Sequence, residues 1–452
     1  MIAIKFLLAT LFFLNPEDPS LETASVSAYA INTRTGKVII DHNSRKSLMP
    51  GSCMKVVTTA AALQLLGPDF QFQTDLEYDG KIDADGILHG NLYIHGGGDP
   101  CLGSERIPPA LSWQAQTHAW VLAVEKLGIR KIQGEVIGDA AAWEKALAVP
   151  SWNWEDLGNY YGAGACALSF HENAYTLTFV PASTVGAAAH LAGTEPPLWG
   201  VTLQTEVTTG PVGSGDQACI YGSEYSPIQA IRGTIPAGVK QFSIRGAIPN
   251  PPDFCARALL KALQDKGIAV QAKPLRPSSP RTAFHTTFSP PLKTIVHAVN
   301  QVSHNLYAEH LLKKIGEKVE LQGSTLAGAR AITQFWQQKH IDLKGFNMAD
   351  GSGLSRKNMI TAQQLVAILA EMKTSESFSY FLQSLPKKGT HLFAKSGSMA
   401  FVKAYAGYAG DIAFALLVNH SQDPDLVKKI DQFLSVLDQP SADENPAVPS
   451  KR

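Results

Sequence analysis

The chain has 452 residues, about three times the size of a common single domain, so we expect two or three domains. Its 39 Lys and Arg residues balance 39 Asp and Glu residues, so no net charge attracts phosphate backbones or anionic lipid. Glycine and proline follow no period, which excludes collagen-like and low-complexity chains. The composition therefore predicts a folded globular protein that does not bind nucleic acid.

The amino end combines Lys5 with an apolar run from Phe6 to Leu14, followed by a polar segment. This order is typical of a secretory signal peptide, to which we assign residues 1–19. This run of nine small or apolar residues is too short to span a bilayer as a helix, so we expect no stable membrane span. The alternative is a hydrophobic terminus that packs on the folded domain, because no clear small-residue cleavage site follows the run.

The five cysteines are scattered, without a C-x-x-C pair, and their odd number leaves at least one thiol free. None of the 13 histidines lies in an H-E-x-x-H motif. These spacings are unlike those of zinc ribbons, redox centres and metalloproteases. We therefore expect no metal, and the family resemblance described below implies no other cofactor.

In chain order, alternating apolar residues at 26–31 and 37–41 around a turn segment predict a β-hairpin. The run from Ser52 to Leu66 is apolar nearly all round and predicts a buried helix. Residues 76–284 then show short strand-like pieces separated by glycine, with few helical patterns. We interpret this stretch as an inserted region of mostly β structure.

Helical periodicity returns in the last third of the chain, over residues 292–314, 324–338 and 361–372. Three apolar runs with glycine turns between them, at 392–396, 402–408 and 412–419, predict an antiparallel meander. An amphipathic helix is expected at 426–437. Residues 441–452 have nothing to bury, so we expect a disordered tail.

The first candidate for chemistry lies at the start of the buried helix. Ser52 and Lys55 are three residues apart on one helical face, close enough for a hydrogen bond. A serine needs a proton acceptor to become a nucleophile, and a lysine among apolar residues can serve as that base. A single S-x-x-K is weak evidence, because Ser384 and Lys387 repeat it, although Pro386 breaks any helix there and we expect both side chains to face solvent.

Two further short motifs could complete such a site. Ser303 and Asn305 lie two apart within a predicted helix, so they can reach a common site only at a helix end or in a tight turn. Lys395 and Ser396 lie on a predicted strand, where they could bind a carboxylate. Gly397 follows them and would leave room for a ligand to approach the backbone.

Together, the order Ser52, Ser303 and Lys395 matches the signature set of active-site serine penicillin-recognising enzymes. The chain resembles the low-molecular-mass class C penicillin-binding proteins, the D-alanyl-D-alanine carboxypeptidase/endopeptidase family also called peptidase family S13. The resemblance runs from about Val26 to Ala409. It includes the segments 50–63, 90–100, 152–157, 161–163 and 350–356.

Three residues depart from the pattern of this family. Gly51 replaces the usual alanine before the nucleophile, His304 occupies the middle of the S-x-N motif, and Ser396 stands where threonine is usual. None of these changes removes a required functional group. Serine at position 396 keeps the hydroxyl and loses a methyl group, which could weaken carboxylate binding.

The resemblance implies an α+β fold, with a β-lactamase/transpeptidase-like catalytic domain formed by residues 20–75 and 285–440 and an inserted domain at 76–284. It also implies a role for each candidate residue. Ser52 would attack the carbonyl between two D-alanines, and Lys55 would accept its proton. Ser303 would pass a proton to the leaving D-alanine while Asn305 holds the substrate amide.

By the same resemblance, Lys395 and Ser396 would hold the terminal carboxylate, next to Gly397. The backbone N–H groups of Ser52 and Ser398 would form the oxyanion hole. The expected partners are peptidoglycan peptides as substrates and β-lactam antibiotics as covalent inhibitors. We expect an exported protein in the periplasm or on the extracellular face of a bacterial cell; the sequence leaves the oligomeric state open.

Two alternatives remain at this point. A β-lactamase shares all three motifs, but such enzymes are generally shorter and lack so large an insertion. A penicillin-recognising fold without turnover could serve as a wall-binding module. Against this, a site that has lost catalysis has no reason to keep five converging polar groups, those of Ser52, Lys55, Ser303, Asn305 and Lys395. Release of free D-alanine from a peptide distinguishes the peptidase from both.

Overall fold

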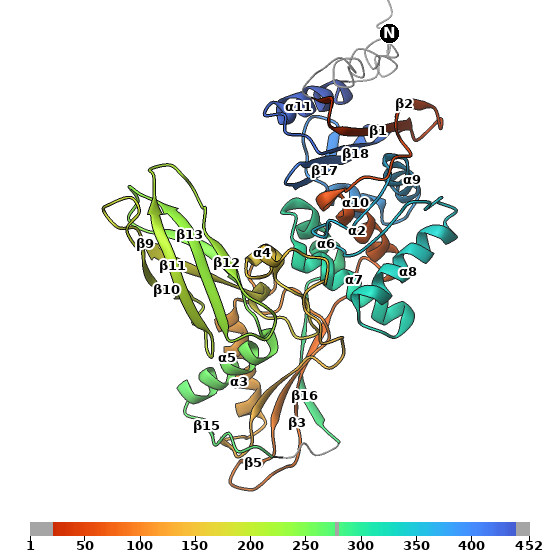
Figure 1. The fold of residues 1–452 in the computed structure, drawn as a ribbon. Helices are drawn as coiled ribbons and strands as arrows, with labels where there is room; N and C mark the ends of the chain where they lie inside the picture. The colour runs from red at the N-terminus through yellow and green to blue at the C-terminus, as the bar shows by residue number, and fades with distance from the viewer. Residues whose placement is uncertain (1–20, 276–279, 440–452) are drawn as a thin grey trace, which may run out of the picture. The chain divides into compact units, whose positions relative to one another are not determined.

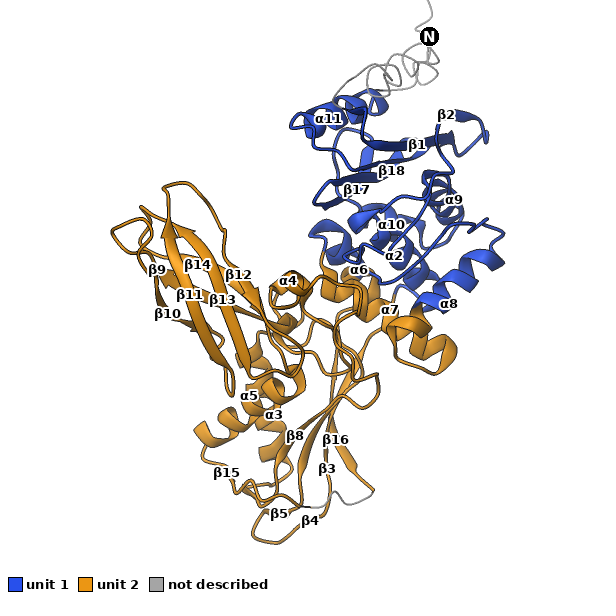
Figure 2. Ribbon diagram, viewed as in Figure 1, with its two compact units in different colours: residues 1–68, 296–303, 329–452 blue, residues 69–295, 304–328 orange. Residues whose placement is uncertain are grey.

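The computed structural model describes residues 21–275 and 280–439, which form two compact units (Figure 2). Among these residues, unit 1 comprises 21–68, 296–303 and 329–439, and unit 2 comprises 69–275, 280–295 and 304–328. The sequence predicts domain boundaries after residues 75 and 284, whereas the units divide after residues 68, 295, 303 and 328. The predicted signal peptide at 1–19 and the predicted tail at 441–452 lie outside the described residues.

Unit 1 contains a five-stranded antiparallel sheet with the strand order β17-β18-β19-β1-β2. Its strands are β1 (Ser25–Asn32), β2 (Val38–His42), β17 (Leu392–Met399), β18 (Val402–Ala409) and β19 (Ile412–Asn419). In the turn between β1 and β2, the side chain of Asn32 accepts hydrogen bonds from the backbone N–H groups of Arg34 and Thr35, each at 3.0 Å. The predicted hairpin and the predicted meander are both confirmed.

Helices cover both faces of this sheet (Figure 1). The helical segments of unit 1 include η2 (Gly51–Cys53), α2 (Met54–Leu65), α9 (Ala362–Lys373), α10 (Phe378–Ser384) and α11 (Leu426–Leu437). The apolar side of α11 packs on one face, where Ile430 and Phe433 join a core with Phe414 of β19. On the other face, α9 packs against β1, β18 and β19.

Helix α2 fills the interior of unit 1. Every residue from Met54 to Leu63 is buried, so the helix has no solvent-exposed face along that length. Helix α9 begins with a capping box, in which the hydroxyl of Thr361 and the side chain of Gln364 each accept from the other's backbone N–H at 3.0 Å. The predicted helices at 52–66, 361–372 and 426–437 are thus confirmed.

The predicted helix over residues 292–314 is wrong in one respect, because the structure breaks it in two. Helix α6 (Leu292–Gln301) ends before a short turn, and α7 (Asn305–Glu320) begins after it; α8 (Thr325–Gln338) follows as expected. Within the turn, Ser303 has a φ of +58°, a left-handed conformation that an α-helix does not allow. The apolar periodicity continues across this turn, so it could not reveal the break.

Unit 2 holds four small sheets. Their orders are β16-β3-β6-β8, β15-β7-β5-β4, β10-β9-β14 and β11-β13-β12. The strands are β3 (Gln73–Tyr78), β4 (Lys81–Ile82), β5 (Ile87–His89), β6 (Leu92–Gly96), β7 (Lys131–Ile132), β8 (Val136–Asp139), β9 (Ala174–Val180), β10 (His190–Glu195), β11 (Thr202–Gly210), β12 (Cys219–Tyr221), β13 (Ile228–Pro236), β14 (Phe242–Ala247), β15 (Ala269–Val270) and β16 (Thr282–Phe288).

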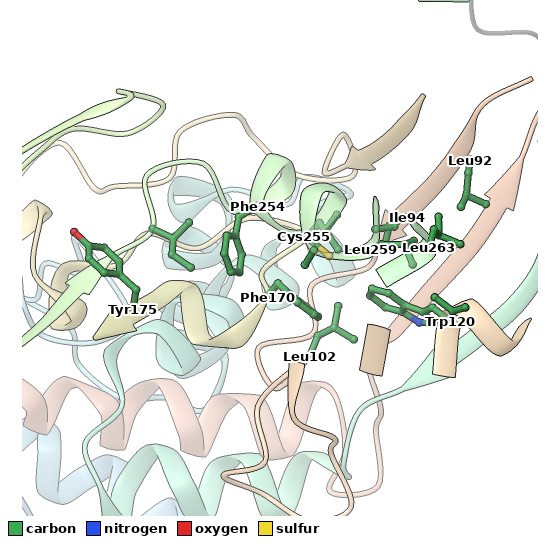
Figure 3. Close-up of a cluster of buried hydrophobic side chains, with 14 of the residues drawn as sticks. Leu92, Ile94, Leu102, Trp120, Phe170, Tyr175, Phe254, Cys255, Leu259 and Leu263 are labelled. Atoms are coloured by element: carbon green, nitrogen blue, oxygen red, sulfur yellow. The ribbon is translucent and has the colours of Figure 1, made fainter. Parts of the chain in front are cut away.

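Unit 2 also has helices that the sequence did not indicate clearly. They are α3 (Trp113–Lys126), α4 (Trp154–Leu157), η3 (Tyr160–Gly162), η4 (His171–Asn173) and α5 (Pro251–Asp265). Helix α5 starts with proline after the capping side chain of Asn250. Figure 3 shows the core between these elements, where Trp120 of α3 stacks on Phe170 at 5.8 Å and Phe254 and Leu259 come from α5.

All five cysteines are free thiols. Within residues 21–275 and 280–439, no helix is both long enough and apolar enough to cross a membrane. In the same part of the chain, no group of three or more His, Cys, Asp or Glu side chains is arranged to hold a metal ion.

Candidate active site

Ser52 lies in the short 3-10 turn η2, directly before the buried helix α2. Its hydroxyl oxygen accepts a hydrogen bond of 2.9 Å from Nζ of Lys55, as the i,i+3 spacing predicts. The Lys55 side chain is fully buried, whereas Ser52 keeps partial exposure among buried neighbours. The turn therefore presents one hydroxyl at the surface with an amine directly behind it.

A loop from the segment 350–358 holds the amine of Lys55 in place. Its Nζ donates to the carbonyl oxygen of Ser352 at 2.6 Å, and one turn further along α2 the hydroxyl of Thr58 donates to the carbonyl of Gly351 at 2.7 Å. The loop is organised by the buried Asp350, which accepts backbone N–H groups of the same loop at 2.6 and 2.7 Å. The loop therefore fixes the amine of Lys55 through the carbonyl of Ser352 and fixes the next turn of α2 through the carbonyl of Gly351.

Glycines allow three backbone segments to meet at Ser52. A Cβ atom added to Gly397 of β17 would lie 2.2 Å from the carbonyl oxygen of Pro50 and 3.0 Å from the backbone nitrogen of Ser52. A Cβ atom added to Gly353, which has a φ of +85°, would lie 1.9 Å from the carbonyl oxygen of Gly51. The position that a side chain at 397 would occupy is therefore filled by the protein's own turn.

Strand β17 carries the third motif and lies at the edge of the sheet. Lys395 is almost fully buried, and its Nζ donates to the carbonyl oxygen of Ser396 at 2.7 Å. Burial lowers the pKa of Lys395 to about 8. Because strand side chains alternate, Lys395 shares the Gly397 face with the Ser52 turn, whereas Ser396 points to the opposite face.

Part of the outer edge of β17 is open. Among the described residues of unit 1, pairing on that side ends at Phe393, which forms a bridge with Lys387, and at Ala394, whose N–H donates to the carbonyl of Pro386. The backbone nitrogen of Ser398 lies 3.1 Å from a Cβ position built on Gly51. The N–H groups of Ser52 and Ser398 are thus both beside the Gly51 turn.

The second motif occupies the turn between α6 and α7. Ser303 is the last residue of the 296–303 segment of unit 1, and Asn305 is the first residue of α7 in unit 2. The side-chain amide of Asn305 donates to the carbonyl oxygen of Tyr161 at 2.8 Å. Of the two arrangements that would let both residues reach a common site, the structure has the tight turn between helices.

The second S-x-x-K sequence does not form a comparable pair. Ser384 is fully buried at the end of α10, contrary to the expected solvent exposure, and its hydroxyl donates to Phe381 and accepts from the amide of Asn300. Lys387 is exposed. Ser384 is a structural residue because its hydroxyl is used by these buried contacts.

Sequence reasoning missed the contribution of the 350–358 loop. In the sequence, this segment stands out only through the family resemblance, which does not predict its contact with Lys55. The sequence Asp-Gly-Ser-Gly at 350–353 does favour a tight turn. In such a turn, the aspartate carboxylate can accept hydrogen bonds from backbone N–H groups of the same loop.

Comparison with known proteins gives consistent matches over nearly the whole chain. A D-alanyl-D-alanine carboxypeptidase from Actinomadura sp. (strain R39) is 26% identical over 443 residues, covering 90% of this chain and 80% of the relative. The D-alanyl-D-alanine carboxypeptidase DacB of Haemophilus influenzae is 23% identical over 460 residues, covering 95% and 93%.

The fold is also similar to that of a protein whose crystal structure is known. The crystal structure of penicillin binding protein 4 (dacB) from Haemophilus influenzae matches with a TM-score of 0.79 at 22% identity, covering 95% of this chain and 97% of that one. The predicted α+β fold class is therefore confirmed. The model of the D-Ala-D-Ala carboxypeptidase 3 (S13) family matches residues 15–439, which carry all three motifs and the 350–358 loop, and the chain belongs to that family.

Proposed function

We propose that the protein is a serine-type D-alanyl-D-alanine carboxypeptidase/endopeptidase that cleaves peptidoglycan stem peptides through an acyl-enzyme. The observation that carries the proposal is the 2.9 Å hydrogen bond between Ser52 and the buried Lys55. Membership of the D-Ala-D-Ala carboxypeptidase 3 (S13) family supports the substrate class.

In this mechanism, Ser52 attacks the carbonyl carbon between the two D-alanines while its proton moves to Nζ of Lys55. Lys55 needs a free electron pair for this step, and its other contacts, such as that with the carbonyl of Ser352, keep the amine oriented towards Ser52. The tetrahedral intermediate then collapses, the peptide bond breaks and D-alanine leaves with a proton. Water hydrolyses the ester on Ser52 and restores the enzyme.

The second motif is assigned to the leaving group and the substrate backbone. Ser303 passes the proton to the amine of the departing D-alanine, and Asn305 holds the substrate amide. The turn conformation of Ser303 supports this assignment, because it takes both residues out of a continuous helix. The existing hydrogen bond from Asn305 to Tyr161 would orient the carboxamide.

The third motif is assigned to the charged end of the substrate. The ammonium of Lys395 pairs with the terminal carboxylate. Because Ser396 faces the other side of β17, its hydroxyl would contribute only if the carboxylate lies at the open edge of the strand, between the two faces. The open edge of β17 next to Gly397 lets the peptide lie beside the strand. The N–H groups of Ser52 and Ser398 stabilise the oxyanion, and a single donor of this kind is typically worth about 10²–10³ in rate.

β-Lactam antibiotics are proposed as covalent inhibitors, because the strained lactam amide and its neighbouring carboxylate imitate the D-alanyl-D-alanine end. A structure of penicillin binding protein 4 from Haemophilus influenzae in complex with a β-lactam supports this for a protein of the same fold. We propose that the protein is exported and acts in the periplasm or on the extracellular face of a bacterial cell, where such peptides are found.

The test combines two measurements on purified protein. Fluorescent penicillin should label the wild type covalently, and diacetyl-lysyl-D-alanyl-D-alanine should release free D-alanine. Ser52→Ala should abolish both, whereas Ser384→Ala, which alters the second S-x-x-K serine, should retain both. Labelling that persists in Ser52→Ala would refute the nucleophile.

The same experiment separates the competing functions. Rapid penicillin hydrolysis without D-alanine release would identify a β-lactamase. Stable labelling without release of D-alanine, either from the tripeptide or from cross-linked peptidoglycan, would identify a binding module without turnover.

A further inference from the structure

Glu172 carries a buried carboxylate that the proposed chemistry leaves without a role. Its side chain is 6% exposed, and it belongs to the segment 171–173, in which three consecutive residues have φ values of +54°, +57° and +49°. Residues other than glycine adopt this conformation at an energetic cost, and runs of them are uncommon. The surroundings, and not local preference, must therefore hold Glu172 where it is.

Three hydrogen-bond donors and a second guanidinium converge on this carboxylate within unit 2. Its Oε1 accepts from the hydroxyls of Ser104 and Tyr307, each at 2.9 Å, and Arg106 donates to both oxygens. A second guanidinium, from Arg245, lies 3.6 Å from Oε2. Burial alone would raise the pKa of Glu172, but hydrogen bonds with His304 and Arg106 hold it well below its usual value.

The remaining neighbour of Glu172 is His304, the middle residue of the S-x-N motif. Its Nε2 lies 3.3 Å from Oε2 of Glu172, and its ring stacks on Tyr307 with centroids 4.1 Å apart. Its Nδ1 is buried without a hydrogen-bond partner among the described residues. Burial, aided by the guanidinium groups of Arg106 and Arg245, lowers the pKa of His304, while the carboxylate of Glu172 acts in the opposite direction.

His304 is bonded directly to both motif residues. Ser303 precedes it with a φ of +58°, and Asn305 follows it with its amide on the carbonyl of Tyr161. Rotation of the main chain at His304 would change the direction of both neighbouring side chains. The contact with Glu172 and the stacking on Tyr307 leave the imidazole no freedom to follow such a rotation.

We propose that Glu172 is a positioning residue that acts through His304 to set the directions of the Ser303 hydroxyl and the Asn305 amide. The inference rests on the proposed function, which gives these two residues their roles. Glu172 itself contacts neither substrate nor reacting atoms. Histidine in the motif thus serves as a hydrogen-bonded anchor for the turn.

The experiment compares Glu172→Gln, which removes the charge at nearly constant volume, with His304→Phe, which keeps a stacking ring and removes the N–H donor. The readouts are the rate constant for labelling of Ser52 by fluorescent penicillin and the kcat and KM for D-alanine release. Asp79→Asn is the matched control, because Asp79 is also a buried carboxylate of unit 2 but bonds Asn91 and Tyr93.

Each single variant should be labelled by fluorescent penicillin about 10–10² times more slowly than the wild type, because misplaced groups lose their alignment with the reacting bond. For D-alanine release, kcat should fall, and KM should change less than kcat. The double variant Glu172→Gln/His304→Phe should be no slower than His304→Phe alone, since Glu172 acts through His304. Asp79→Asn should melt at a lower temperature and label at the wild-type rate.

A wild-type labelling rate in Glu172→Gln would overturn the inference, and so would single-variant losses that multiply in the double variant. If Glu172→Gln does not fold, Glu172→Asp replaces it in both the single and the double variant, and the same criteria apply. Wild-type protein that neither labels nor releases D-alanine would overturn the proposed function and this inference together. If the wild type is active and the Glu172 variant labels and releases D-alanine at the same rates, only the inference is overturned, and the proposed function stands.

Discussion

Nζ of Lys55 lies 2.9 Å from the hydroxyl oxygen of Ser52 although the lysine side chain has no exposed surface. Such an arrangement is costly for stability, because a buried amine must be held by polar partners. The carbonyl of Ser352 is one of these partners. This cost is consistent with the proton transfer that we propose for the pair, and packing alone does not account for it.

Lys55→Ala should slow acylation by fluorescent penicillin by about 10²–10⁴, the usual contribution of a general base, while the protein remains folded. Lys55→Met, which fills the same space with an apolar chain, should be equally slow and should melt at a higher temperature than Lys55→Ala. Stopped-flow labelling and thermal melting check both points. Acylation of Lys55→Met at the wild-type rate would mean that another group takes the proton.

Gly397→Ala should both destabilise unit 1 and slow acylation. The added methyl group would meet the carbonyl of Pro50 at 2.2 Å, so β17 and the Ser52 turn must separate, at a cost of about 1–3 kcal/mol. We expect labelling to fall at least tenfold. Gly410→Asn is the control, because Gly410 has open space and a positive φ that asparagine tolerates. Equal labelling by both variants would contradict the argument.

The pH dependence of kcat/KM should report Lys395. Burial places its pKa at about 8, and only the charged ammonium binds a carboxylate, so kcat/KM for a D-alanyl-D-alanine peptide should decline as the pH rises above about 8. Lys395→Arg keeps its charge at every accessible pH and should lose this decline. A decline that is unchanged in the arginine variant would assign the titration to another group.

Asp99 should make the protein less stable as the pH rises from about 4 to about 7. Burial raises its pKa to about 7, so the folded state keeps a proton that the unfolded chain releases in this range. Asp99→Asn keeps an oxygen for the N–H of Cys101 and carries no charge. Its stability advantage should grow with pH, reaching up to about 4 kcal/mol at pH 8.

Thermal melting of the wild type and Asp99→Asn at pH 5 and pH 8 checks this prediction. The difference in melting temperature between the two proteins should be small at pH 5 and larger at pH 8. A difference that does not change with pH would show that Asp99 stays charged in the folded protein, or that its proton has no influence on folding.

The parts of the site that depend on local geometry could be predicted from the sequence. Ser52 and Lys55 are one helical turn apart, so helix geometry alone places them together. Strand β17 was likewise predictable from its apolar run. The turn at Ser303 was expected only as one of two possibilities, since a positive φ at serine has no local sequence signal.

The rest depends on contacts between residues far apart in the chain. The approach of Gly397 to Pro50 joins residues almost 350 positions apart, and the pairing of β3 with β16 joins the two ends of the predicted insertion. No periodicity encodes such a contact, because it depends on the assembled backbone. The same holds for the carboxylate of Glu172, whose partners come from three separate segments.

The repeated crossing of the chain between its two units has a consequence for protein engineering. Helix α7 belongs to unit 2 through buried contacts such as His310 with Ser169 and Lys313 with the carbonyls of Ala146 and Ala165. A minimal enzyme made by deleting residues 76–284 would therefore retain α7 but remove the groups on which it packs. Neither unit can be obtained by a single cut or a single deletion, because each is built from several segments of the chain. Engineering of this protein should therefore start from the whole chain.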